Sequence, residues 1–468
     1  MPKNLYEEIE ELYHPRSMAA VGVSERMENQ GMGFLIGYKK LGFQGGLYAI
    51  NPTKKFDKFD TYPSVKDVPG PLDKVKICVP AKAVPQVMRD CVEKGVKTAT
   101  IFSSGFRESG TEEGAALEEE VLAIAKEGGI RVIGPNCMGL YCPESGMSIR
   151  GDMPAVEGGN ISLIAQSGGV AISFIMMAAE KGLGVAKAVS YGNESDLGPP
   201  EFLHYMARDP ATKVICLYIE GTRRPEELKD ALADAASKKP VVVLKGGSTD
   251  VGNRAVASHT GALTGQAEVW DAFIRQCGAM PVSDIKEMLD GAVLYSLSAP
   301  PPGDRVGLLT VSGGFGVFAT DQVIKAGFRM PRFSDEVTAR IKEFINAPGT
   351  SVANPADMAA KFFQPQHYEK MFRAFDDENN FDCYVMIMAM EYLAFLGSRE
   401  REVSTFLVKA IKGGLDLMKK PVYIVFYQTA ADQVRLDHVR YLLNEGYPVF
   451  DDMASALRVL KKSMVTLP

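Results

Sequence analysis

A repeat in the later part of the chain constrains its fold more than any other sequence feature. The segment ISLIAQSGGVAISFIMMAAEKGL (161–183) aligns without a gap with VGLLTVSGGFGVFATDQVIKAGF (306–328), at an offset of 145 residues. Further along each copy, KKPVVVLKGG (238–247) corresponds to KKPVYIVFYQ (419–428). Internal similarity at a fixed period indicates repeated structural units. The repeat therefore predicts two similar α/β domains, each with a flavodoxin-like, doubly wound sheet.

The part of the chain before the repeat alternates short apolar runs with helical patterns, which is typical of βαβ units and a parallel sheet. Helix candidates at 81–95 and 110–129 end on glycine, as helices often do. Strands are expected at 17–24, 46–52, 75–81, 97–106 and 130–136. We predict a Rossmann-like domain followed by two flavodoxin-like domains, with bounds 1–150, 151–298 and 303–468. The last two are joined through the proline-rich segment 296–305.

Charge and hydropathy exclude several classes of function. The net charge of the 468 residues is -6, and no long basic run is present, so we expect neither a nucleic-acid nor a membrane-surface role. No apolar run is long enough to span a bilayer. The N-terminal sequence MPKNLYEEIEELYHP is acidic and lacks the apolar region of a signal peptide. These features predict a cytoplasmic protein.

The seven cysteines are predicted to be reduced. Their number is odd, and several lie inside apolar strand patterns, which is typical of buried thiols in a reducing compartment. Cys137 and Cys142 form the closest pair, but their spacing alone is weak evidence for a metal. We therefore expect no metal site.

Each repeat begins with a strand, then Ser-Gly-Gly, then a helix. Glycine permits a tight turn, and a helix start presents backbone N–H groups and partial positive charge, which suits a phosphate. A plain strand-to-helix turn is the alternative, but the occurrence of two equivalent copies favours phosphate binding, with two opposed helix starts enclosing one phosphoryl group. The predicted phosphate-binding residues are Ser167, Gly168, Gly169, Ser312, Gly313 and Gly314.

His259 is the candidate nucleophile. It lies in ASHTGALTG (257–265), after a strand and a glycine-rich polar stretch, and so is predicted to lie on a mobile loop. A neutral imidazole can attack phosphorus when a carboxylate or carbonyl holds the proton of its other nitrogen. Glu220, at the carboxyl end of the expected buried strand VICLYIEG, is the natural partner. The alternative for Glu220 is a surface glutamate at a helix start.

Several motifs together resemble one family. ASHTGALTG, LYIEG, AQSGGVAIS, IGPNCMGL and the opening AAVGVS with GLYAINP are similar to the nucleoside-diphosphate-forming acyl-CoA synthetases, relatives of succinyl-CoA synthetase. The resemblance runs through essentially the whole chain. It implies a CoA-binding Rossmann domain and a phosphohistidine at His259, stabilised by Glu220. The two helices that face the phosphohistidine in that family match the starts at 167–169 and 312–316.

Nothing in the sequence resembles the ATP-grasp domains of the fused members. The resemblance therefore implies an α subunit of the ADP-forming acetate–CoA ligase type. An ATP-grasp β subunit, in an α2β2 complex, would bind ATP or ADP with Mg. The implied reaction converts a small carboxylic acid, CoA and ATP to acyl-CoA, ADP and phosphate, through an acyl phosphate and phosphohistidine.

The ligand of the first domain has two candidates, CoA and NAD. The first loop, VGVSERMENQGMG, lacks the G-x-G-x-x-G fingerprint, and lysines replace the acidic residue expected for NAD after the second strand. CoA is therefore favoured, with Gly22, Ser24, Asn51, Lys54, Pro80 and Asn136 as predicted contacts. For Lys54 or Lys55, a solvated loop lysine is an equal alternative. A catalytically inactive CoA-binding regulatory or scaffold protein is the alternative function, and an NAD-dependent oxidoreductase is the third.

Overall fold

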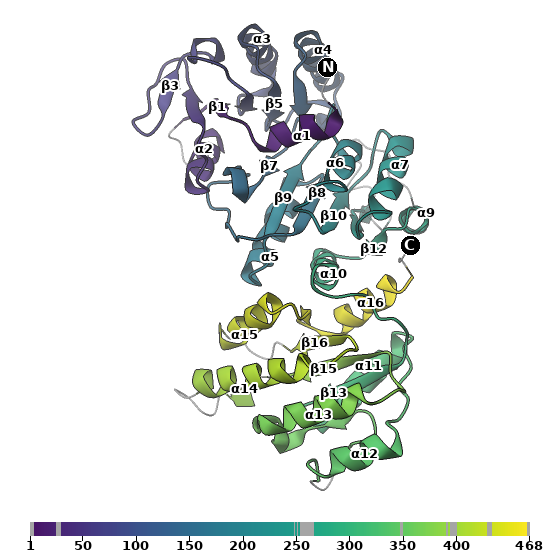
Figure 1. Cartoon of the computed structure of the whole chain (residues 1–468). Helices are drawn as coiled ribbons and strands as arrows, with labels where there is room; N and C mark the ends of the chain where they lie inside the picture. The colour runs from purple at the N-terminus through teal and green to yellow at the C-terminus, as the bar shows by residue number, and fades with distance from the viewer. Residues whose placement is uncertain are drawn as a thin grey trace. The chain divides into compact units, whose positions relative to one another are not determined.

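The computed structural model describes residues 4–24, 30–247, 249, 251–252, 266–346, 350–389, 392–393, 400–427 and 433–465. They form two compact units, of which the first ends at Met288 and the second begins at Leu289. The described residues contain two sheets in the first unit and one in the second (Figure 1).

The first sheet has six parallel strands in the order β3-β2-β1-β4-β5-β6, which is the Rossmann order. They are β1 (Ser17–Val21), β2 (Gly46–Ile50), β3 (Asp60–Tyr62), β4 (Lys74–Ile77), β5 (Thr98–Ile101) and β6 (Arg131–Ile133). The sequence predicted five of these strands but missed β3. Each of the five ends earlier than predicted, because the glycine, proline and polar residues that follow form loops at the carboxyl edge of the sheet.

Helices cover both faces of the first sheet, because successive side chains of a strand point to opposite faces. Ala19 and Val21 pack in one buried cluster with side chains of α3 (Val84–Lys94) and α4 (Glu112–Gly128). Met18 and Ala20 pack in a second cluster with α1 (Leu5–Tyr13) and α2 (Gln30–Lys40). The sequence predicted α3 and α4.

The second sheet has the order β12-β11-β10-β8-β9-β7. Its five parallel strands have the flavodoxin order, and β7 pairs antiparallel with β9 at the edge. The strands are β7 (Gly139–Tyr141), β8 (Ile161–Ala165), β9 (Val185–Ser190), β10 (Val214–Ile219), β11 (Val241–Lys245) and β12 (Met280–Val282). The helices are α5 (Gly168–Glu180), α6 (Pro199–Met206), α7 (Pro225–Ala236) and α9 (Ala267–Gln276). Helix α10 (Ile285–Leu297) follows, and the division between the two units falls within it.

The first two sheets share a core. Buried side chains of α6, α7 and α9 belong to the same apolar cluster as those of α1 and α2. In addition, β7 joins the second sheet although it precedes the predicted boundary at residue 150. These contacts explain why both sheets form one compact unit. The predicted three-domain bounds stay a prediction.

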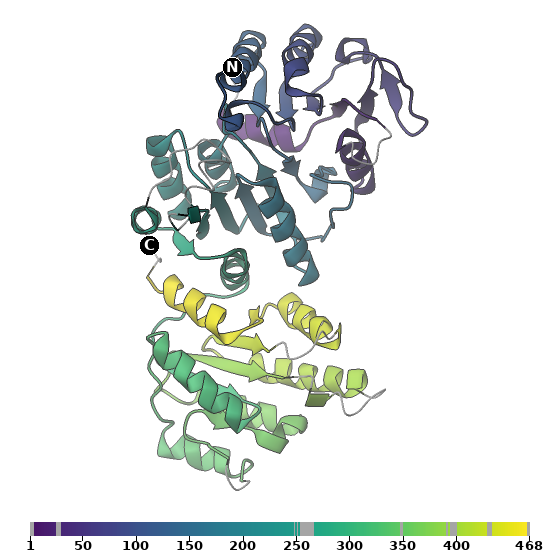
Figure 2. The same cartoon turned by 180° about the vertical axis from the view of Figure 1, so that it is seen from behind.

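The third sheet has five parallel strands in the order β14-β13-β15-β16-β17, which is again the flavodoxin order. The strands are β13 (Val306–Thr310), β14 (Ala356–Asp357), β15 (Cys383–Met388), β16 (Val422–Phe426) and β17 (Val449–Phe450). The helices are α11 (Gly313–Lys325), α12 (Asp335–Lys342), α13 (Gln366–Asp376), α14 (Glu400–Leu415), α15 (Gln433–Asn444) and α16 (Met453–Ser463). Helices α13 and α14 lie on one face of the sheet (Figure 1), and α11 and α16 lie on the other (Figure 2).

The repeat in the sequence corresponds to a repeat in structure. The pairs β8–α5 and β13–α11 occupy the same place in their sheets, as the first strand and first helix of each flavodoxin order. The predicted fold class, a Rossmann-like domain followed by flavodoxin-like sheets, is confirmed.

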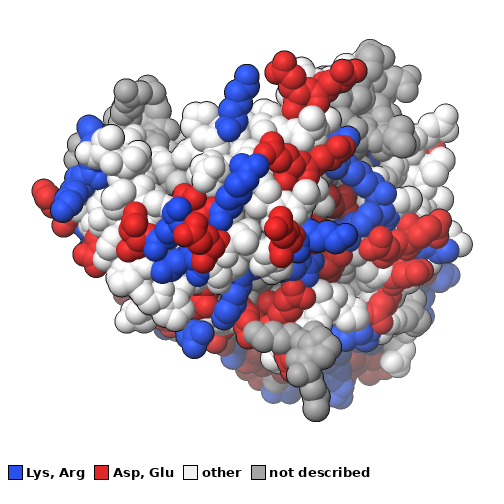
Figure 3. Space-filling model, turned by 90° about the horizontal axis from the view of Figure 1, so that it is seen from above, with Lys and Arg blue, Asp and Glu red and all other residues white. Residues whose placement is uncertain are grey.

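The described helices are all too short or too polar to cross a membrane. On the face shown in Figure 3, Lys and Arg are interspersed with Asp and Glu, and no large area carries one sign of charge. Such a face lacks the basic patch that binding to nucleic acid requires.

Candidate active site

Two predicted CoA residues shape the carboxyl edge of the first sheet. Gly22 follows β1 with a φ of +86°, and a Cβ there would lie 2.8 Å from the carbonyl oxygen of Cys78. Only glycine therefore fits between the loops that follow β1 and β4. Asn51 follows β2, and its side-chain amide donates to the carbonyl oxygen of Val23 over 2.8 Å. Ligands of Rossmann folds bind at this edge.

The Asn51 side chain also orders the loop that carries Lys54. Its Oδ1 accepts hydrogen bonds from the backbone N–H groups of Thr53 and Lys54, both over 2.9 Å. The Lys54 side chain is exposed. Ser24 is the last described residue before the gap at 25–29. The Asn51 side chain therefore ties the loop after β1 to the loop after β2, and Lys54 stays a predicted CoA contact.

A cavity of about 430 Å³ lies beyond the carboxyl ends of β4, β5 and β6. It brings together three predicted site residues, Pro80, Asn136 and Gly168. The other lining residues are Cys78, Val79, Phe102, Ser103, Ser104, Cys137 and Met138. Loops of the first sheet and the start of α5 in the second sheet therefore share one cavity.

Sequence reasoning missed Ser103, Ser104 and Met138. The serines lie in IFSSGF, which we predicted as strand, but β5 ends at Ile101. Ser103 donates from its hydroxyl to the carbonyl oxygen of Val79 and accepts at its own carbonyl oxygen from the N–H of Asn136 over 3.0 Å. Ser103 thus ties the loops after β4 and β6 together. Two polar residues directly after an apolar run were the signal that could have identified this loop.

The two thiols of the cavity are unreactive. Burial raises the pKa of the Cys78 thiol to about 12 and also raises the pKa of Cys137. The Cys137 thiol lies within hydrogen-bond distance of the carbonyl oxygens of Ile101 and Ile133. Both thiols stay protonated at neutral pH, so neither serves as a nucleophile.

The start of α5 has the geometry of an anion site. Ser167 caps the helix, its side-chain oxygen accepting from the N–H of Val170 over 3.4 Å. A Cβ on Gly168 would lie 2.4 Å from Cγ of Met138, whereas a Cβ on Gly169 would meet nothing closer than 3.8 Å. The first N–H groups of a helix have no partner inside the helix, and the helix dipole adds positive charge there. Gly169 lies beside open space and leaves room for a phosphate.

Glu220 lies next to this helix start. It directly follows β10 and is 5% exposed. Its backbone N–H donates to Oε1 of Gln166 over 2.7 Å, and the Tyr218 hydroxyl donates to Glu220 Oε1 over 3.0 Å. Gln166 immediately precedes Ser167, so the first hydrogen bond joins the end of β10 to the start of α5. The predicted position at the end of a buried strand is correct, and the alternative of a surface glutamate is wrong.

This junction lies where ligands bind in flavodoxin-like sheets. Strands β8 and β10 are neighbours, and the connections from them run in opposite directions along the sheet. Such a topological switch point leaves a crevice at the carboxyl edge. The start of α5 and Glu220 both face it from the two adjacent strand ends.

His259 lies outside the described residues, in the gap at 253–265. The segment that leads toward it begins beside Glu220. Gly246 follows β11, and a Cβ there would lie 2.6 Å from the Tyr218 hydroxyl and 3.2 Å from Cγ of Glu220. The Gly246 N–H donates to the carbonyl oxygen of Ile219 over 2.8 Å. The chain therefore leaves β11 in contact with the Glu220 side chain.

Lys245 adds a cation near Glu220. Burial lowers the pKa of Lys245, and the nearby Glu220 carboxylate opposes this shift. The ammonium lies 5.2 Å from the centre of the Trp270 ring, close enough for a cation–π contact.

The helix start of the second repeat has different surroundings. The Ser312 hydroxyl makes no capping bond to α11 within the described chain. A Cβ on Gly313 would lie 3.1 Å from Oδ2 of Asp357, whereas Gly314 has open space around it. A carboxylate therefore lies beside the start of α11, where the first repeat has Met138. Its negative charge opposes anion binding there.

Cys142 lies near His14 and Glu144 instead of forming a metal site with Cys137. One possible ligand atom from each of these three residues lies within 4.8 Å of the others. A closed structural zinc site has four ligands, and a ligating thiol must be ionised. Burial instead raises the pKa of Cys142. We assign no metal to this group.

Family comparisons agree with the two sheets of the first unit. The model of the CoA binding domain family matches residues 16–143, and the model of the succinyl-CoA ligase like flavodoxin domain family matches residues 158–295. Fold and site therefore define a protein with a CoA-binding Rossmann domain joined to a succinyl-CoA ligase like flavodoxin domain.

Curated relatives identify the family. The alpha subunit of ADP-forming acetate–CoA ligase II from Pyrococcus furiosus is 31% identical over 453 residues, which cover 96% of both chains. ADP-forming acetate–CoA ligase II from Archaeoglobus fulgidus is 34% identical over 463 residues, covering 97% of this chain but 66% of that protein. The chain thus spans about two thirds of the length of the A. fulgidus relatives. It belongs to the family of ADP-forming acetate–CoA ligases, as the sequence motifs predicted.

A solved structure agrees with this family assignment. The dinucleotide forming acetyl-coenzyme A synthetase 1 of Ca. Korarchaeum cryptofilum, in complex with phosphate and ADP, superposes with a TM-score of 0.81 at 28% identity. The match covers 98% of this chain and 96% of that one. The likeness therefore extends over both units.

Proposed function

We propose that this chain is the α subunit of an ADP-forming acyl-CoA synthetase. The reaction would convert a small carboxylic acid, CoA and ATP to acyl-CoA, ADP and phosphate. The observation that carries the proposal is the shared cavity, in which Pro80 and Asn136 of the first sheet lie with Gly168 of the α5 start. Acyl transfer to CoA requires the thiol and the acyl phosphate to meet, and a common cavity lets them do so.

The proposed reaction has three steps. The imidazole of His259 takes the terminal phosphoryl group of ATP, and ADP leaves. The carboxylate of the acid then attacks that phosphorus, which forms an acyl phosphate and frees the imidazole. The CoA thiol loses its proton and attacks the acyl carbon, and inorganic phosphate leaves with the electrons of the broken C–O bond.

Glu220 would hold the ring proton of His259 and so present the other nitrogen to phosphorus. Three contacts support this role. The Glu220 side chain lies beside Gly246, it accepts a hydrogen bond from Tyr218, and its backbone N–H donates to Gln166. The N–H groups of Gly168 and Gly169 would hold the transferred phosphoryl group. Ser312, Gly313 and Gly314 would play the same part from α11.

CoA would lie along the carboxyl edge of the first sheet. Gly22 and Asn51 would form its floor, and the exposed Lys54 would pair with a phosphate. The thiol would react in the cavity lined by Pro80 and Asn136. Ser24 completes the predicted contacts. The family match to a CoA binding domain over 16–143 favours CoA over NAD.

ATP or ADP with Mg would bind to an ATP-grasp β subunit, in an α2β2 complex. The P. furiosus relative, covered almost to its full length, is itself named an alpha subunit. We further propose a cytoplasmic location, since seven free cysteines, six of them buried, fit a reducing compartment.

Phosphorylation of the purified chain tests the proposal. Incubation with acetyl-CoA and labelled inorganic phosphate should label His259 without any added subunit, since the CoA site and helix starts belong to this chain. The label should be stable in base and labile in acid, and His259→Ala should abolish it. Labelling of a different residue in the presence of β would show that the histidine is structural. A chain that binds CoA but is never labelled, even with β, would instead be a regulatory or scaffold protein.

A further inference from the structure

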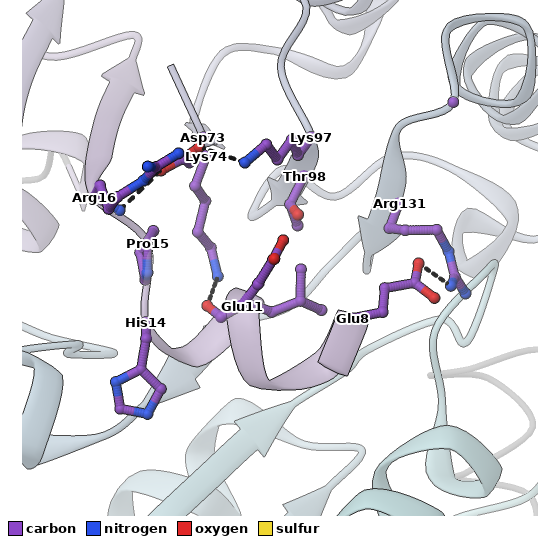
Figure 4. A pocket seen from close by; sticks show the side chains of 12 residues that line it. Glu8, Glu11, His14, Pro15, Arg16, Asp73, Lys74, Lys97, Thr98 and Arg131 are labelled. Carbon is purple, nitrogen blue, oxygen red and sulfur yellow. Dashed lines mark hydrogen bonds and ion pairs between the residues drawn. The ribbon is translucent and has the colours of Figure 1, made fainter. Parts of the chain in front are cut away.

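A second cavity, of about 780 Å³, lies at the amino ends of the first-sheet strands. Arg16, Asp73, Lys97 and Arg131 line it where β1, β4, β5 and β6 begin, and α1 closes one side (Figure 4). The candidate active site lies at the other end of the same strands. We name this space the amino-edge cavity. The chemistry proposed above does not use it.

Three of the four Lys and Arg side chains in its lining already have carboxylate partners. Asp73 pairs with Arg16 over 3.4 Å and with Lys97 over 2.9 Å. Arg131 pairs with Asp196 over 2.8 Å and with Glu8. Figure 4 shows the pairs that Asp73 makes with Arg16 and Lys97, and the pair between Arg131 and Glu8. They neutralise the rim and leave the remaining cation, Lys74, as the exception.

Lys74 is 2% exposed and has no carboxylate within ion-pair distance in the described chain. Among the described residues, its ammonium donates to the carbonyl oxygen of Leu12, over 3.3 Å. Burial lowers the pKa of Lys74 to about 7, the Lys76 charge acts in the same direction, and Cys137 opposes it. Glu11 lines the same cavity, but outside ion-pair distance of Lys74. A buried cation without a counter-ion is costly, and a bound anion would remove that cost.

We propose that the amino-edge cavity binds a small metabolite through an oxyanion, carboxylate or phosphate, which pairs with Lys74. The volume lies in the usual range for small-molecule sites. Lys97 and Arg131 are already paired with carboxylates, so Lys74 is the cation that an anion would meet, and the Thr98 hydroxyl offers a neutral hydrogen bond beside it. The ligand gives the Lys74 ammonium an anionic partner at hydrogen-bond distance, in addition to the carbonyl oxygen of Leu12.

Proton uptake on binding provides the test. An anion beside Lys74 raises its pKa, so at pH 8 the protein should take up about one proton per anion bound. Calorimetric titration of the full chain, in two phosphate-free buffers with different ionisation enthalpies, measures this number. Acetate and inorganic phosphate are titrated separately, because uptake with one and not the other identifies the oxyanion. Lys74→Met should abolish the uptake.

Lys97→Met is the matched control. It removes the same charge from the same cavity, but from a side chain that Asp73 already neutralises, so uptake should persist. Chemical acetylation of the unmodified chain provides a second measurement, which does not depend on whether the variants fold. Either anion that binds should slow acetylation of Lys74 by acetic anhydride, read by mass spectrometry, at least several-fold relative to Lys97.

Two results would overturn the inference. One is proton uptake that persists in a folded Lys74→Met protein, because the proton would then bind to a group other than Lys74. The other is the absence of both proton uptake and protection of Lys74 with acetate and with phosphate. Neither measurement requires catalysis, so failure here is distinct from failure of the proposed synthetase function.

Discussion

At the scale of single residues, the proposed phosphohistidine depends most directly on Glu220 among the side chains that the structure describes. It is buried, and its carboxylate accepts from Tyr218 while lying against Gly246. These contacts fix its orientation before any histidine arrives. Gly246 also has to be small, since a larger residue would displace either the tyrosine hydroxyl or the glutamate.

We expect Glu220→Gln to lower the steady-state phosphohistidine ~10- to 100-fold, because a charge-assisted hydrogen bond is worth about 1.5–3 kcal/mol. An amide is also unable to balance the charge of an imidazolium. CoA affinity should stay unchanged, since the predicted CoA contacts lie on the first sheet. Labelled phosphate bound to the protein measures the first quantity, and calorimetry measures the second.

Two variants serve as controls for that measurement. Glu226→Gln removes an equal charge from an exposed position in the first turn of α7 and should have no effect. Tyr218→Phe keeps the carboxylate but removes its hydrogen bond, so its effect should be intermediate. A normal phosphohistidine level in Glu220→Gln would refute the assigned role.

At the scale of elements, the two repeated strand–helix units have the same fold but different electrostatics. Helix α5 begins beside the sulphur side chain of Met138, and α11 begins beside the carboxylate of Asp357. Backbone geometry is set by the repeat, whereas these neighbours come from other segments. Of the two proposed anion sites, the one at α5 should therefore bind the more strongly.

Proline substitutions at equivalent positions of the two repeats compare the helix starts of α5 and α11. Gly169→Pro and Gly314→Pro each remove one N–H from a first helical turn, where proline is tolerated and where no neighbour is crowded. We expect Gly169→Pro to lower phosphohistidine formation ~10-fold or more and Gly314→Pro to lower it less. Rates of labelling by inorganic phosphate measure both.

Gly169→Ala retains the N–H and should behave like the unchanged protein. Equal losses in the alanine and proline variants would show that the helix start acts through its shape and not through its N–H groups. A larger loss in Gly314→Pro would reverse the assigned ranking of the two helices.

At the scale of the whole molecule, the chain supplies the proposed CoA site and both helix starts but no predicted nucleotide site. It matches the P. furiosus alpha subunit over nearly the full length of both. The proposed division of labour therefore separates two half-reactions. In this proposal, acyl-CoA and phosphate would react on this chain, and ADP would react on a partner chain.

We expect the chain alone to form no ATP from acetyl-CoA, ADP and phosphate, and to form it when an ATP-grasp β chain is added. Luminescent detection of ATP measures this, and light scattering after size-exclusion chromatography should show an α2β2 mass. His259→Ala mixed with the same β chain is the control and should be inactive. ATP formation by the purified chain alone would contradict the proposed partner.

Much of the fold follows from local sequence patterns. The repeat at 161 and 306 predicts two flavodoxin-like sheets, because strand and helix periods are properties of short segments. The place of Glu220 at the end of a buried strand follows from the apolar run before it. The family follows from short motifs such as ASHTGALTG. These features require no knowledge of which distant segments touch.

Other features were decided by tertiary structure alone. The strand order brings Asn136 and Gly168 into one cavity and moves β7 into the second sheet. In the sequence, Lys74 is one residue of a short strand. Its ammonium is buried beside a cavity because α1 lies near the amino ends of β4 and β5. The physical reason is that side-chain periodicity specifies which face of an element is apolar. Which charged or polar neighbour meets that element depends on contacts between segments far apart in the chain.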